Sequence, residues 1–131
     1  MYQKIHKIIM LSLVLLFLTG ISTVFAAANF QFHATEVCYL NPQRDDILVV
    51  KGVISNDGDS TGRMYGVGMK VKCWDNQGRL CVNDNAYFDT NITLNSGETV
   101  GWEFTIHHSN NTRYHGPWKW DVDSHQKWEN Y

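Results

Sequence analysis

The sequence predicts an all-β protein: an immunoglobulin-like antiparallel β-sandwich of about seven strands, preceded by a signal peptide helix. Three observations support this. A positively charged start and a long apolar stretch occupy the first 28 residues. After them, apolar and polar residues alternate with a period of two, and clusters of Gly, Asn, Asp and Ser interrupt the alternation about every ten residues. Beyond the signal, no stretch has the pattern of a long helix.

Residues 1–28 have the features of a cleavable signal peptide. Two lysines precede an uncharged, largely apolar stretch over residues 8–25, and small residues then fit cleavage after Ala26 or Ala28. An uncleaved membrane anchor is the alternative, because about 20 apolar residues span a bilayer. Thr, Gly and Ser dilute the second half of the stretch, which favours cleavage. In both cases we expect the remainder to be exported, either periplasmic or secreted.

The net charge of the exported part argues against some classes of binding partner. The chain has eleven Lys and Arg against thirteen Asp and Glu, and two of the lysines lie in residues 1–28, so the exported part carries a net charge of −4. An acidic domain is a poor match for nucleic acid or for an anionic membrane surface. We therefore expect no nucleic-acid partner, and no membrane contact after signal cleavage.

The alternation of apolar residues predicts the first two strands. Alternation begins at Phe30 and runs through Cys38, which shares the parity of the early apolar residues and is therefore expected to face the core. Asn41-Pro42 ends this strand. The second strand covers residues 48–54, where Val on both parities predicts cover on both faces, and it ends at the turn cluster of residues 56–59.

The third strand has the clearest core-facing stripe, formed by Tyr65, Val67, Met69, Val71 and Cys73. Residues 75–78 predict a three-residue hairpin loop in which Gly78 has a positive φ. A return strand begins at residues 80–82, and one further strand is expected around residues 86–92.

A second tight turn at residues 95–98 leads into a strand over residues 100–106, where Trp102 and Phe104 share the core parity. A polar loop follows, and residues 118–122 predict the last strand. The domain is thus expected to cover residues 29–122. Residues 123–131 are polar and predict a C-terminal tail.

Three stretches resemble a known family. Lys51 to Gly58 has a strand, a Gly, a strand and then Asn-x-Gly; Val71 to Asp75 stands where Phe-x-Leu-Tyr-Asp would fall; and Leu94 to Glu98 stands where Leu-x-Pro-Gly-Glu would fall. These are features of the FxLYD domains, extracytoplasmic modules of bacteria and archaea. Four motif positions differ, since Val, Cys, Trp and Ser replace Phe, Leu, Tyr and Pro. The resemblance, over residues 48–106, implies an immunoglobulin-like fold without catalytic residues.

The three cysteines allow one disulfide, which could form between different pairs of them. A three-residue hairpin loop places Cys73 opposite Cys81, at a separation that a disulfide can bridge, for a gain of about 2–3 kcal/mol. Cys38, on the predicted core parity, is left as a free thiol or as an alternative partner for either of the other two. The exported compartment is oxidising and permits one such bond.

No pattern requires a metal or a catalytic site. Three histidines near one loop could be drawn together with Asp121 or Asp123, but their spacing does not compel a zinc site, and solvated loop histidines are the simpler interpretation: His107, His108 and His115. Residues 57–61 lack the terminal Glu of a calcium loop. We expect no cofactor, no metal and no enzymatic activity.

The remaining candidates form a binding surface. Trp74 shares its predicted face with lysines, which suggests an aromatic, cationic patch. The candidate binding residues are Trp74, Lys70, Lys72, Tyr114 and Trp128. The sequence therefore predicts a non-catalytic binding or structural module whose partner is a protein or a cell-envelope component. The alternative is a periplasmic inhibitor or immunity protein for a cognate toxin or hydrolase, which the size, acidic charge and export signal allow.

Overall fold

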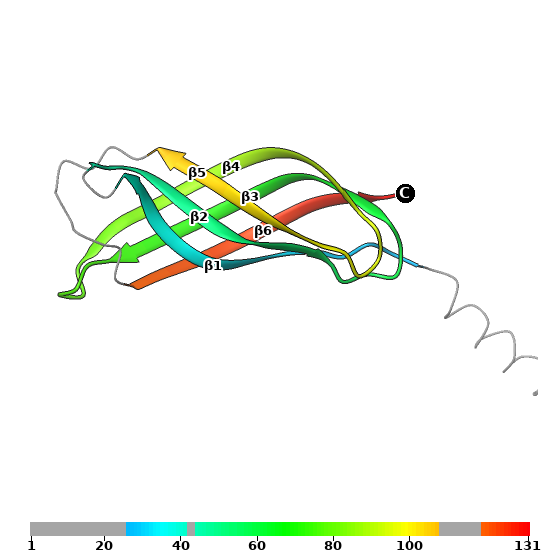
Figure 1. Ribbon diagram of the computed structural model, residues 1–131, viewed down its shortest axis with the longest axis horizontal. Coiled ribbons are helices and arrows are strands. Elements are labelled where there is room, and N and C mark those ends of the chain that lie inside the picture. The colour runs from blue at the N-terminus through cyan, green and yellow to red at the C-terminus, as the bar shows by residue number, and fades with distance from the viewer. Residues whose placement is uncertain (1–25, 42–43, 108–118) are drawn as a thin grey trace, which may run out of the picture.

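The computed structural model describes residues 26–41, 44–107 and 119–131. Over these ranges the chain is all-β, as predicted, and forms two antiparallel sheets of three strands each. The first sheet has the order β1-β2-β5 and the second the order β4-β3-β6 (Figure 1). The strands are β1 (Phe30–Asn41), β2 (Arg44–Asn56), β3 (Gly62–Trp74), β4 (Leu80–Leu94), β5 (Thr99–His107) and β6 (Lys119–Asn130).

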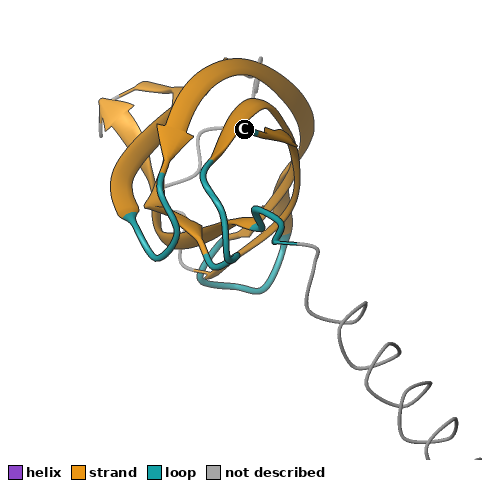
Figure 2. Ribbon diagram, turned by 90° about the vertical axis from the view of Figure 1, so that its right-hand side faces the viewer, coloured by secondary structure: helices purple, strands orange, loops and turns teal. Residues whose placement is uncertain are grey.

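One hydrophobic core lies between the two sheets. Alternate residues of each strand point inward and are removed from water, which supplies the main driving force for the fold. Phe104 of β5 joins the sheets, because its ring contacts Phe88 of β4 at 4.7 Å between centroids and Phe32 of β1 at 5.1 Å. Viewed from one end, the curved strands surround this core as a ring (Figure 2). The fully buried members include Phe30, Leu48, Val50, Ile54, Met64, Val67, Val71 and Cys73.

Both predicted tight turns are present. Gly78 and Gly97 have φ angles of 78° and 79°, a region that side chains with a Cβ rarely adopt. In the first turn the N–H of Gly78 donates to the carbonyl of Asp75 at 3.1 Å, and the N–H of Asp75 donates to the carbonyl of Arg79 at 2.9 Å. The predicted three-residue loop between Asp75 and Arg79 is therefore confirmed.

Two strand boundaries differ from the prediction. Residues 80–94 form one continuous strand where two were expected, so the described part of the chain has six strands instead of about seven. The polar tail predicted for residues 123–131 is also wrong, because β6 runs to Asn130 and pairs with β3 along its length. Strand β6 lies at the edge of its sheet, where water covers its outer face, so its sequence can be polar at many positions.

Two β-bulges reverse the predicted direction of particular side chains. In β1 the register shifts between Ala34 and Glu36, so Val37 is buried and Cys38 turns away from the core, contrary to the prediction. In β3 the register shifts after Met64, which is buried, and the following Tyr65 is 39% exposed instead of facing the core. An extra residue changes the parity of the strand after it, and nothing in the alternation marks its position.

Trp102 keeps its predicted parity but is not buried. It lies opposite Gly52 of β2 and is 38% exposed, because β5 is the edge strand of the first sheet. On β2, Val49 is covered on the outer face as expected, whereas Val53 remains 38% exposed. Core parity therefore predicts burial in the middle of a sheet better than at its edge.

The predicted signal peptide lies almost wholly outside the described residues, which begin at residue 26. In the part of the chain that is described, no helix has the length and apolar character needed to cross a membrane.

Asn56 closes one end of the sandwich. Its side chain is fully buried, and its Oδ1 accepts hydrogen bonds from the N–H groups of Asn29 at 3.0 Å and Gly58 at 3.1 Å. Its Nδ2 donates to the carbonyls of Ser60 at 2.8 Å and Leu94 at 3.0 Å. One amide thus satisfies four backbone groups from the start of β1, the turn after β2 and the end of β4.

The backbone of Asn56 completes this junction. Its N–H donates to the carbonyl of Glu98 at 3.0 Å, and its carbonyl accepts from the N–H of Gly97 at 2.8 Å. The side chain reaches into the second sheet while the backbone holds the turn that leads to β5. Asn56 therefore links the two sheets at this end of the sandwich.

We expect Asn56→Ala to reduce the free energy of unfolding by about 3 kcal/mol, because it leaves the carbonyls of Ser60 and Leu94 and two N–H groups without their partner in a buried site. Urea unfolding followed by circular dichroism measures this. Asn85→Ala, which removes an exposed amide from β4, serves as the control and should change the midpoint little. Equal midpoints for the two variants would show that Asn56 does not have this role.

Candidate functional site

The outer face of the second sheet is the candidate binding surface. Directly opposite residues of antiparallel strands share a face, so the register defines this surface in rows across β4, β3 and β6. The rows, each written in the order β4, β3, β6, are Leu80, Trp74 and Lys119; Asn83, Lys72 and Asp121; Asn85, Lys70 and Asp123; Tyr87, Gly68 and His125; and Asp89, Gly66 and Lys127.

Two aromatic rings stand at opposite ends of this face. Trp74 is half-buried, and the Nζ of Lys119 lies 5.1 Å from its ring centroid. Tyr87 is 54% exposed, and the Nζ of Lys127 lies 5.3 Å from its ring centroid. Each ring therefore has a lysine from β6 within the range of a cation–π contact and still presents surface to solvent.

Gly66 makes room for the ring of Tyr87. A Cβ at this position would collide with the hydroxyl oxygen of Tyr87, so the tyrosine can lie across the middle strand only because residue 66 has no side chain. Gly68, opposite Tyr87, also lacks a side chain. At this end of the outer face, β3 therefore has no side chains at Gly66 and Gly68, and the ring of Tyr87 packs on the backbone of β3.

The charges on this face are balanced. The lysines of β3 were expected to make the patch cationic, but β6 places Asp123 opposite Lys70 and Asp121 opposite Lys72. The expectation failed because the sequence does not show that the last strand lies beside β3, and because it predicts a tail from residue 123 onward. A balanced face attracts neither strongly acidic nor strongly basic partners over long range.

The structure separates the predicted binding residues. Trp74, Lys70 and Lys72 share the outer face, as predicted. Trp128 does not: it faces the core, its Nε1 donates to the carbonyl of Ala28 at 3.0 Å, and its ring contacts Phe30. Tyr114 lies outside the described residues.

Tyr87 is an exposed residue of this face that is not among the binding residues predicted from the sequence. Its parity is that of Asn83, Asn85, Asp89 and Asn91, all exposed on one side of β4. That run of amides and carboxylates around a single aromatic residue was the available signal, but dividing β4 into two strands concealed it.

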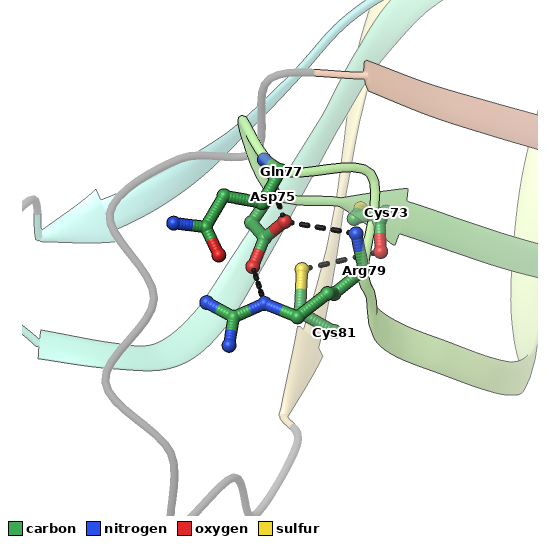
Figure 3. A network of polar contacts seen from close by, with 5 residues as sticks. All are labelled: Cys73, Asp75, Gln77, Arg79 and Cys81. Atoms are coloured by element: carbon green, nitrogen blue, oxygen red, sulfur yellow. Dashed lines mark hydrogen bonds and ion pairs between the residues drawn. The ribbon is translucent and has the colours of Figure 1, made fainter.

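No disulfide joins the three cysteines, all of which lie in the described residues. Cys73 lies opposite Val82, because a register shift at the start of β4 places Cys81 outside the regular pairing. The Sγ of Cys81 donates to the carbonyl of Cys73 at 3.1 Å (Figure 3). The predicted Cys73–Cys81 disulfide is therefore wrong, and the alternatives with Cys38 fail because the bulge in β1 turns Cys38 outward.

Burial makes the thiol of Cys73 unreactive. It raises the pKa of Cys73 to about 12, with smaller contributions from the nearby Cys81 and Asp84. Burial also raises the pKa of Cys38, with Glu36 adding to the shift. Neither side chain is a thiolate at neutral pH, so neither acts as a nucleophile.

Asp75 organises the hairpin between β3 and β4. Its Oδ1 accepts from the N–H groups of Gln77 and Arg79, both at 2.9 Å, and its Oδ2 accepts from the Nε of Arg79 at 2.8 Å (Figure 3). Desolvation alone would raise the pKa of Asp75, but the hydrogen bonds from Arg79 and Gln77 outweigh it and hold the pKa below its ordinary value. The hairpin next to Trp74 therefore depends on an ionised carboxylate.

Asp75→Asn should lower the melting temperature by a few degrees at pH 6, with a difference that narrows as the pH falls. A depressed pKa stabilises the folded protein fully above the pKa of the unfolded chain, about 3.9, and this contribution is lost as the pH falls through the lower folded value. Thermal melts of parent and variant between pH 2 and 6 measure this. Asp89→Asn is the control of equal charge, and a difference for Asp75→Asn that does not depend on pH would contradict the assignment.

The described residues contain no group of three His, Cys, Asp or Glu side chains arranged to hold a metal ion. His107 is exposed at the end of β5, and His108 and His115 lie outside the described ranges.

Comparison with known proteins adds little. No family model and no curated protein matches the sequence. Two solved structures are similar over part of the chain: a β-glucosidase from Kluyveromyces marxianus, with 14% identity over 61% of this chain and a TM-score of 0.41, and a β-glucosidase from Listeria innocua in complex with isofagomine, with 15% identity over 74% and a TM-score of 0.42. The matches span 9% and 16% of those longer chains. Similarity at this level carries no argument about activity.

Proposed function

We propose that the chain is an exported, non-catalytic module with an immunoglobulin-like fold, which binds a protein or another cell-envelope component through the outer face of its second sheet. The observation that carries the proposal is the pair of rings on that face, Trp74 and Tyr87, which remain partly exposed beside amide and charged side chains. Exposed aromatic residues with a polar surround are typical of binding surfaces.

The order in which the strands enter the two sheets supports the proposal of an immunoglobulin-like fold. The chain makes β1 and β2 in the first sheet, β3 and β4 in the second, returns to the first as β5 and ends in the second as β6. Repeated crossing between two packed antiparallel sheets is typical of immunoglobulin-like sandwiches. We also propose a relationship to the FxLYD domains, because the residues that carry the resemblance lie at the Asn56 junction and at the hairpin of Asp75.

Trp74→Ala/Tyr87→Ala should reduce capture of the native partner at least fivefold, because both rings lose their contact area without opening the core. Cells producing the tagged full chain are treated with a crosslinker, and the captured envelope material is quantified by mass spectrometry.

The matched control is Leu40→Ala/Val53→Ala, which removes two exposed apolar side chains from the first sheet. It should leave the captured material unchanged. Equal capture by the parent and by the Trp74/Tyr87 variant would contradict binding at this face. A captured toxin or hydrolase would assign the inhibitor role.

For export, we propose cleavage after Ala26 in preference to Ala28. Ala28 is buried, its N–H donates to Oδ1 of Asn130 at 2.7 Å, and the carbonyl of Ala27 accepts from the N–H of Asp59 at 2.8 Å. Cleavage after Ala28 would remove these contacts from the domain.

The mature protein should therefore begin with Ala27-Ala28-Asn29. Intact-mass measurement and N-terminal sequencing of protein recovered from outside the cytoplasm test this. An N-terminus at Asn29 would contradict the preferred site, and an intact N-terminal segment would favour the membrane anchor.

A further inference from the structure

We propose that two copies of this chain associate through β6, which pairs with β6 of a second copy in antiparallel orientation about a twofold axis at Ser124. The two second sheets would then form one continuous six-stranded sheet. This inference concerns the edge of the sheet and stands independently of the proposed binding face.

Strand β6 is a long edge strand, and β1 of the first sheet lies close to part of it without pairing with it. It has 12 residues, about 40 Å of strand. Within the described part of the chain, β6 pairs with β3 on one side and with no strand on the other. An edge of this length presents unpaired backbone N–H and C=O groups along its free side, which a further strand can satisfy.

The core-facing residues of β6 are also incompletely covered. They lie opposite buried residues of β3, yet each is only half-buried, and β6 contains no fully buried residue. Trp120, Val122 and Trp128 pack against the core from this position. A neighbouring strand would remove more of their apolar surface from water. The five residues are Trp120, Val122, Ser124, Gln126 and Trp128.

The outward-facing charges of β6 are self-complementary. Antiparallel pairing about Ser124 places residue i opposite residue 248 − i of the second copy, on the same face. Each outward lysine then meets an acidic side chain, and Asp123 meets His125, whose ring N–H can donate a hydrogen bond to it. The pairs are Lys119 with Glu129, Asp121 with Lys127, and Asp123 with His125, and each occurs twice in the dimer.

Neighbouring registers lack this match. An axis at Asp123 would place Asp123 opposite its own copy and Lys119 opposite Lys127, and an axis at His125 would place Asp121 opposite Glu129. Like charges directly opposite each other are destabilising. Axes one residue further from Ser124, at Val122 or Gln126, again bring two acidic residues together. The charge pattern therefore specifies one register.

The opposite edge of the second sheet is less suited to this pairing. On β4 the outward face has a single charge, Asp89, and Asp84 points inward, where its Oδ2 is buried without a hydrogen-bond partner among the described residues. An inward-pointing charge is a device that discourages pairing at an edge strand. Self-association is therefore assigned to β6.

Two single charge reversals test the register. In Lys127→Asp the two Asp121–Lys127 pairs of the dimer become acidic on both sides, and in Asp121→Lys they become basic on both sides. Each variant should have a dimer dissociation constant at least tenfold above that of the parent in sedimentation equilibrium. An equimolar mixture of the two variants should form a heterodimer with parent-like affinity. In that heterodimer the substituted residues of the two copies face each other with opposite charges, and so do the two unchanged residues.

Matched controls are Lys51→Asp and Asp89→Lys, which make the same changes in net charge away from β6 and should leave the dimer intact. Urea unfolding confirms that all variants are folded. A parent that is monomeric at about 100 μM, well above the dissociation constants of specific dimers, would overturn the proposal. So would charge variants that dimerise like the controls, or a mixture that does not recover.

A crosslink tests the axis directly. Ser124 is the only β6 residue opposite its own copy, so Ser124→Cys should give a disulfide-linked dimer on mild oxidation of the purified protein. Val122→Cys, displaced from its own copy by four positions, or about 13 Å, should not. The parent reports any background from the native thiols. Equal crosslinking of the two variants, or none for Ser124→Cys, would contradict the register.

Discussion

The buried amide of Asn56 is the constraint on which the architecture depends. Its four side-chain hydrogen bonds and two backbone bonds join the start of β1, the end of β2, the following turn and the approach to β5. A sandwich of two three-stranded sheets has a core that orients the sheets but does not fix their ends. A buried polar group with all its bonds satisfied is specific in geometry, which apolar contacts are not. Asn56 supplies that specificity at one end.

At the other end, Asp75 has a similar role without linking the sheets. It holds the β3–β4 hairpin through Gln77 and Arg79, next to Cys73 and Cys81, which no disulfide joins. The position expected for a disulfide is thus stabilised by charge-assisted hydrogen bonds. The difference is functional as well as structural, because an ionised carboxylate makes this end sensitive to acid while a disulfide would make it sensitive to reductants.

Strand β6 links the fold to both proposals. By pairing with β3 it places Asp121 and Asp123 beside the lysines of the middle strand, which converts an apparent cationic patch into a balanced face carrying Trp74 and Tyr87. The other edge of β6 pairs with no described strand. In the proposed dimer, the charges of β6 are complementary to those of β6 in the second copy. In the proposed dimer, the twofold axis would place two such faces on the same side of one continuous sheet. Two weak sites on one rigid sheet increase the affinity for a repeated partner.

Local sequence was sufficient for the all-β class, the two glycine turns and most core positions, because these depend on side-chain parity and on the φ angles that individual residues allow. It was insufficient where one residue shifts a register: the bulges in β1 and β3 turned Cys38 and Tyr65 outward, and the shift before Val82 separated Cys73 from Cys81. It also could not show that the last strand continues beyond Val122 to Asn130, or that Trp102 lies at an edge. Those outcomes depend on which strands become neighbours, and that is decided by contacts between residues far apart in the chain.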